Sequence, residues 1–81
     1  MVSEEKKEIM RREGEFLRTL RERMQLSREE FADKIDIWPR EVEDIENGVK
    51  LVPDKVIIVL QEATGASDDE MKSAFGDRWK K

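Results

Sequence analysis

The residues from 36 to 48, DIWPREVEDIENG, hold the side chains whose types and spacing can do chemistry. From Pro39 to Glu46, a single guanidinium stands among four carboxylates, and these groups are Arg40, Glu41, Glu43, Asp44 and Glu46. Guanidinium and carboxylate groups donate and accept directional hydrogen bonds, so the stretch is suited to recognising a polar partner. Carboxylates also act in acid–base catalysis, but these are spaced like the surface charges of a helix rather than as a converging pair.

The composition excludes most catalytic and metal chemistry. The 81 residues include no cysteine and no histidine, which removes thiolate nucleophiles, zinc sites and histidine-based triads. No glycine-rich phosphate loop is present, so we expect neither an enzyme nor a bound metal or cofactor. No apolar run approaches the ~20 residues that cross a bilayer, and the amino terminus has no signal-peptide core. We therefore expect one cytoplasmic domain without a membrane segment.

The charge distribution gives no sign of a basic tail. Charged residues make up 44% of the chain, and the formal net charge is −4. Cations and anions are mixed along the whole length, and a typical DNA-binding domain would be basic instead. Composition alone therefore argues mildly against a nucleic-acid partner.

Apolar spacing predicts that every element is helical, because apolar residues recur at three- and four-residue steps. A first stripe formed by Phe16, Leu17, Leu20 and Met24 ends near Gln25. Ser27-Arg-Glu-Glu30 is a capping box that opens a second helix. The buried face of that helix is expected to consist of Phe31, Ala32 and Ile35.

Three further helices follow the same logic. Pro39 suits the first position of a third helix, which turns Val42 and Ile45 inward and stops at Gly48. A fourth helix runs from Pro53 to about Thr64, with Gly65 as its stop. Ser67 to Glu70 form a second capping box, and the fifth helix is expected to carry on one side Met71, Ala74, Phe75 and Trp79.

The fold class is therefore all-α, a compact five-helix domain over residues 16–81 with a charged extension over residues 1–15. The extension has only a thin apolar edge, at Ile9 and Met10. Two interpretations stay open: it adds turns to the first helix, interrupted at Gly14, or it is a frayed arm.

The stretch LRTLRERMQLSREEFADKIDIWPREVEDIENG resembles the repressor and Cro-like helix-turn-helix family of bacterial and phage regulators, often called the XRE family. The resemblance covers roughly residues 16–76. The features that carry it are Leu26-Ser27 before two glutamates, Ala32 within the second helix, the apolar pair Val42 and Ile45, and Ile-Glu-Asn-Gly at the end of the third helix.

This resemblance implies a repressor-like fold and specific contacts. It implies an internal ion pair between Arg21 and Glu46, with double-stranded DNA bound by the third helix. The DNA-binding residues that it implies are Ser27, Arg28, Trp38, Pro39, Arg40, Glu41, Asp44, Asn47 and Lys50. Among these, Arg40 would read bases, while Arg28, Asn47 and Lys50 would hold the backbone.

The chain also departs from the family at these positions. Trp38 replaces a small polar cap, Pro39 replaces a hydrogen-bonding side chain, and Asp36 stands where the turn often has glycine. Trp38 can pack against the turn or anchor a protein partner instead of DNA. Glu43 can face away from DNA or pair with Arg40 three residues earlier.

The run VIIVL, residues 56–60, is apolar on every face of a helix. Val56, Ile57 and Leu60 are expected in the core, which leaves Ile58 and Val59 unused. By the family resemblance, these two residues and Trp79 form a homodimer interface. The alternative is that the N-terminal extension folds over them.

The sequence thus predicts a sequence-specific DNA-binding transcriptional regulator that acts as a dimer through the third helix. The acidity of that helix supports a second interpretation. In it, the helix-turn-helix fold is a protein-binding module, an antirepressor or antitoxin-like adaptor with little affinity for DNA.

Overall fold

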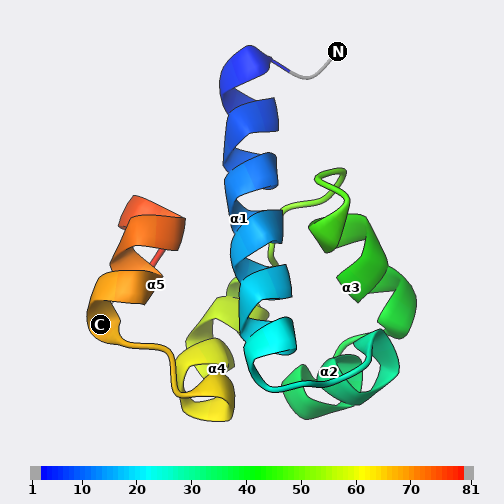
Figure 1. Cartoon of the computed structure of the whole chain (residues 1–81). Helices are drawn as coiled ribbons and strands as arrows, with labels where there is room; N and C mark the ends of the chain where they lie inside the picture. Colours follow the sequence, from blue (N-terminus) through cyan, green and yellow to red (C-terminus); the bar gives the residue numbers. More distant parts are fainter. Residues whose placement is uncertain (1–2, 80–81) are drawn as a thin grey trace.

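The computed structural model describes residues 3–79 and contains five α-helices and one short 3-10 helix. In chain order these are α1 (Glu4–Arg23), α2 (Arg28–Ile35), α3 (Pro39–Glu46), α4 (Asp54–Thr64), α5 (Asp68–Phe75) and η1 (Gly76–Arg78). No strand occurs within the described residues, so the expected all-α class is confirmed. The long helix α1 runs through the middle of the molecule, with α2 and α3 on one side and α5 on the other (Figure 1).

The core contains the apolar positions that helical spacing predicted. All five α-helices contribute to it, and its buried members include Leu17, Leu20, Phe31, Ala32, Ile35, Val42, Ile45, Val56, Ile57, Leu60, Met71, Ala74 and Phe75. Val52 and Ala66, which lie between helices, are buried among them. The core therefore fixes how α2 and α3 are oriented relative to α1.

The two predicted capping boxes are confirmed by their hydrogen bonds. At α2 the Glu30 amide donates to the Ser27 hydroxyl at 3.1 Å, and the Ser27 amide donates to the Glu30 carboxylate at 2.8 Å. The second predicted capping box forms in the same way at the start of α5. Asp36 ends α2 in the left-handed region, with φ of 61°, the position where the family often has glycine.

The expected interruption of the first helix at Gly14 is wrong. α1 is continuous from Glu4, and the Ser3 hydroxyl accepts from the Lys6 amide to cap its start. Met10 is buried, and the Arg12 guanidinium donates to the Ala74 carbonyl of α5 at 3.0 Å. Residues 4–15 are therefore helical rather than a frayed arm and are packed at Met10, Glu13 and Gly14, while residues 1 and 2 lie outside the described residues.

The expected extent of the fifth helix is also wrong. α5 ends at Phe75, because Gly76 takes a positive φ of 56° that turns the chain out of the helix. Trp79 follows η1 and is not on α5, although it still packs, partly buried, against the core.

A buried carboxylate connects α1 to the end of the described chain. Glu13 is fully buried, and it accepts from the Val52 amide at 3.1 Å and from the Arg78 guanidinium. Arg78 also donates to the Val52 carbonyl. One ion pair thus holds together α1, the loop after α3 and the segment after α5.

At Gly14, α1 lies in close contact with the backbone of α3. A Cβ atom added at this position would lie 2.2 Å from the Ile45 carbonyl oxygen. Any side chain here would therefore push the two helices apart. Glycine is needed for space, not for backbone freedom.

We expect Gly14→Ala to destabilise the fold, although alanine is the better helix former by about 1 kcal/mol. Overpacking against the α3 backbone should lower the free energy of unfolding by about 2 kcal/mol, measured by urea denaturation and circular dichroism. Thr19→Ala, at an exposed position of the same helix, should change it by less than about 0.5 kcal/mol. An unchanged midpoint for Gly14→Ala would contradict the close contact.

Candidate nucleic-acid interface

One of the four carboxylates of α3 points into the protein. The Glu46 side chain is fully buried, and its two oxygens accept from the Arg21 guanidinium of α1 at 2.7 and 3.1 Å. The internal ion pair that the family resemblance implied is therefore confirmed. Because Glu46 is used inside the fold, it does not contribute to the outer surface of α3.

Two more arginines converge on the same carboxylate. Arg28, at the start of α2, places its Nε atom 3.2 Å from Glu46, and Arg18 of α1 places its own at 3.5 Å. Arg28 was expected to hold the DNA backbone, yet its side chain is only about one-third exposed. Arg28 therefore has a structural role, and a contact with DNA would have to be made while its guanidinium stays bound to Glu46.

The arginines keep Glu46 charged. Burial acts to raise the pKa of Glu46, but the hydrogen bonds and charges of Arg21 and Arg28 outweigh it. The pKa of Glu46 is consequently held below its ordinary value. The ionised carboxylate joins α1, α2 and α3, and so fixes the angle at which α3 is presented.

Arg40, the expected base reader, is largely exposed. Its side chain is 79% exposed, and its Nε atom lies 3.3 Å from the Asp44 carboxylate one turn later. The expected pairing of Arg40 with Glu43 is wrong, because Glu43 lies instead 4.0 Å from Arg28. Four-residue spacing puts Asp44 directly over Arg40 on the helix surface.

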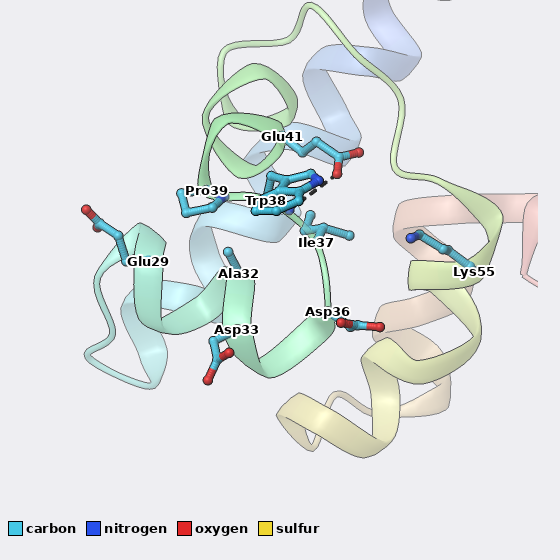
Figure 2. A pocket seen from close by; sticks show the side chains of 9 residues that line it. All are labelled: Glu29, Ala32, Asp33, Asp36, Ile37, Trp38, Pro39, Glu41 and Lys55. Carbon is cyan, nitrogen blue, oxygen red and sulfur yellow. Dashed lines mark hydrogen bonds between the residues drawn. The ribbon is translucent and has the colours of Figure 1, made fainter.

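Lys50, in the loop after α3, also has an acidic partner. Its ammonium group lies 2.6 Å from Glu41, and that carboxylate also accepts from the Trp38 amide at 3.3 Å. These two hydrogen bonds, that of Lys50 first, lower the pKa of Glu41. Glu41 therefore caps the start of α3, where Trp38 provides no side-chain acceptor (Figure 2). The same carboxylate also holds the loop that carries Lys50.

The remaining candidates lie at the ends of α2 and α3. Ser27, Pro39 and Asn47 are exposed, with Asn47 directly after the last turn of α3. Trp38 is 76% exposed, so its expected packing against the turn is wrong. The indole is available to a partner.

Two cations near this surface were missed by sequence analysis. Lys6 of α1 and Lys55 of α4 line the same hollow of about 600 Å³ as Lys50. The three residues are far apart in the sequence and lie on different elements, so no local pattern could group them. Together they provide ammonium groups beside α3 that the acidic helix itself lacks.

The residues expected at a dimer interface lie on α4 and after η1. Ile58 is 80% exposed and Val59 is 41% exposed, so α1 does not cover them and that alternative is wrong. Ile58 lines a hollow of about 700 Å³ together with Trp79 and Ile57. An apolar surface is therefore available on α4.

The candidate interface is nearly balanced in charge. Within the described residues, the implied cations Arg28, Arg40 and Lys50 each face a carboxylate of α3. Binding a phosphate or a base edge would require these cations to exchange an internal partner for an external one. Exposed pairs exchange at little cost, whereas the pairs around Glu46 do not.

A family model described as a helix-turn-helix domain matches residues 14–74 of the chain. This span contains α2, α3 and nearly all of the candidate interface, which confirms the resemblance seen in the sequence. No curated protein and no solved structure gave a significant match. No helix in the described part of the chain is long and apolar enough to cross a membrane.

We expect Glu46→Gln to destabilise the fold at neutral pH by about 3 kcal/mol, because it removes a buried anion from among arginines. The folded-state pKa of Glu46 is depressed, so its stabilisation is complete above the unfolded-state value near 4.5 and is lost as the pH falls further. The wild-type protein should therefore lose more stability on acidification than Glu46→Gln.

Urea denaturation at neutral and acidic pH measures both effects. Glu43→Gln is the matched control, since Glu43 is half exposed and only 4.0 Å from Arg28. It should change stability by less than about 0.5 kcal/mol. Equal losses for the two variants would show that Glu46 does not hold the helices together.

Proposed function

Because the chain belongs to the helix-turn-helix domain family, we propose that it is a sequence-specific DNA-binding transcriptional regulator that acts as a homodimer. The match over residues 14–74 is the observation that carries this proposal. In it, α3 enters the major groove, and α2 lies across the backbone at the groove edge. The rigid connection through Glu46 supports this role, because a reading helix must keep its angle.

Arg40 reads the base edge in this proposal. Its exposed guanidinium can form two hydrogen bonds with the O6 and N7 atoms of a guanine. Breaking the ion pair between Arg40 and Asp44 costs little free energy, since an exposed ion pair is worth about 0–1 kcal/mol. Asp44 and Glu41 then accept from the amino group of cytosine, while Trp38 and Pro39 contact the thymine methyl group.

The backbone contacts come from the ends of the helices and from the loop after α3. Ser27 and Arg28 lie at the start of α2, and Asn47 and Lys50 follow α3. Lys6 and Lys55, which share a hollow with Lys50, extend this set toward the flanking phosphates. Each phosphate that is neutralised releases a counterion, so binding must weaken steeply as salt rises.

A homodimer would double this small number of cations. Ile58 and Val59 of α4, together with Trp79, supply an apolar surface for the second copy. Two-fold symmetry of the protein would then match a two-fold symmetric operator.

We expect selection from a random duplex pool to enrich one sequence with the wild-type protein, and Arg40→Ala to lose that preference. Lys50→Ala should weaken all duplexes alike and reduce the salt slope by about one unit per protomer. Fluorescence anisotropy between about 50 and 200 mM salt measures both quantities. Lys72→Ala, at an exposed position of α5, should change neither. Absence of binding at the lowest salt would refute the DNA proposal.

We expect Ile58→Asp to convert the dimer into a monomer, because two buried carboxylates would face each other across the interface. Sedimentation equilibrium gives the mass directly. Val49→Asp places the same charge on another exposed apolar residue, which is 67% exposed, and should leave the dimer intact. A wild-type protein that sediments as a monomer, or an Ile58→Asp dimer, would contradict the assigned interface.

A further inference from the structure

A hollow of about 490 Å³ lies beside the turn between α2 and α3. Ala32 and Asp33 of α2, Asp36 of the turn and Trp38 before α3 line one part of it, and Lys55 of α4 lies across from them (Figure 2). Its size falls in the range of ligand-binding clefts, about 300–1,000 Å³. It is therefore large enough for a peptide side chain and part of the backbone that carries it.

Among the aromatic residues of the described chain, Trp38 alone does not pack in or against the core. Phe31 and Phe75 are buried in the core, and Phe16 and Trp79 pack against it. The Trp38 side chain is 76% exposed and makes no hydrogen bond within the described residues. An exposed indole at the edge of a hollow is typical of an anchor for another molecule.

The charge around the hollow selects the partner. Glu29, Asp33 and Asp36 line it and make no ion pair within the described residues, in contrast to the carboxylates of α3. Glu41 also lines the hollow but is paired with Lys50, so the three unpaired acids stand against the single lining cation Lys55, a net charge of −2. A negative hollow beside an aromatic face attracts a cation, both through the charges and through the π-system.

We propose that this hollow binds a basic peptide segment of another protein, with an arginine or lysine side chain stacked on the Trp38 indole. Asp33 and Asp36 face the peptide cations, and the indole covers the alkyl part of the stacked side chain. Acidic segments are repelled by the same charges.

The position of the hollow gives this binding a regulatory consequence, which rests on the proposed DNA-binding function. Trp38 and Pro39 begin α3, the end of the helix that would enter the groove first. A peptide seated on Trp38 occupies the space of the DNA, so the two ligands exclude each other. By linkage, each lowers the affinity for the other by the same factor.

The first test uses the full chain carrying Trp79→Phe, so that Trp38 is the only fluorophore. The probe is an eight-residue peptide of alternating arginine and glycine, capped at both ends, and the comparison peptide has glutamate in place of arginine. The arginine peptide should change the Trp38 emission and saturate, whereas the glutamate peptide should not.

Variants distinguish specific binding in the hollow from general electrostatic attraction of the peptide to an acidic protein. Asp33→Asn with Asp36→Asn should weaken arginine-peptide binding about fivefold. The fold should persist, because asparagine accepts the left-handed conformation of Asp36. Asp69→Asn with Asp77→Asn removes the same charge from exposed distant positions and should have little effect. Trp38→Ala, followed by calorimetry, should weaken binding at least about tenfold. Equal effects of the two aspartate pairs, or full affinity of Trp38→Ala, would overturn the proposal.

A second test measures exclusion of DNA. The arginine peptide should release bound duplex from the wild-type protein at lower concentrations than from the Asp33→Asn, Asp36→Asn variant. Direct capture of DNA by the peptide would release both equally, and that result would overturn the regulatory consequence. If the wild-type protein binds no DNA, that consequence fails with the proposed function, while the fluorescence titration still decides the peptide site.

Discussion

The buried carboxylate of Glu46 is the interaction on which the arrangement of the first three helices depends. A carboxylate removed from water is costly unless charged hydrogen-bond donors surround it, and Arg21, Arg28 and Arg18 supply them. These arginines come from α1 and α2, so the requirement to satisfy one anion on α3 sets the positions of both neighbours. Glu46, which adds to the number of acidic residues in α3, is thus the side chain that holds the helix in place.

On the outer face of α3, too, the acidic side chains hold neighbouring groups in place. Glu41 holds Lys50 and the Trp38 amide, and Asp44 holds Arg40. An acidic helix and a few cations therefore form a surface that is neutral at short range, and these exposed pairs can be replaced by ligands of either sign. Such a surface gains little affinity from bulk charge and depends on the fit of individual partners.

The sequence predicted features that depend on interactions between residues close in the chain. It failed for features that depend on contacts between distant residues. Capping boxes at Ser27 and Ser67 were recognised because their hydrogen bonds span three residues. Gly14 was interpreted as an interruption of the first helix. Glycine is required there because the Ile45 carbonyl of α3 leaves no space for a side chain. The pairing of Arg21 with Glu46 came from family resemblance, since 25 residues separate them. Lys6 and Lys55 were missed because only the tertiary fold brings them near Lys50.

The ion pair between Glu13 and Arg78 is formed by residues outside the span that matches the family model. The family match covers residues 14–74, so both partners lie just outside it. They nevertheless meet each other and satisfy the amide and carbonyl of Val52, in the loop that carries Lys50. A fragment cut at the limits of the match would keep every helix-turn-helix residue and leave that loop without its support. The contacts that support this loop therefore reach beyond the span that identifies the family.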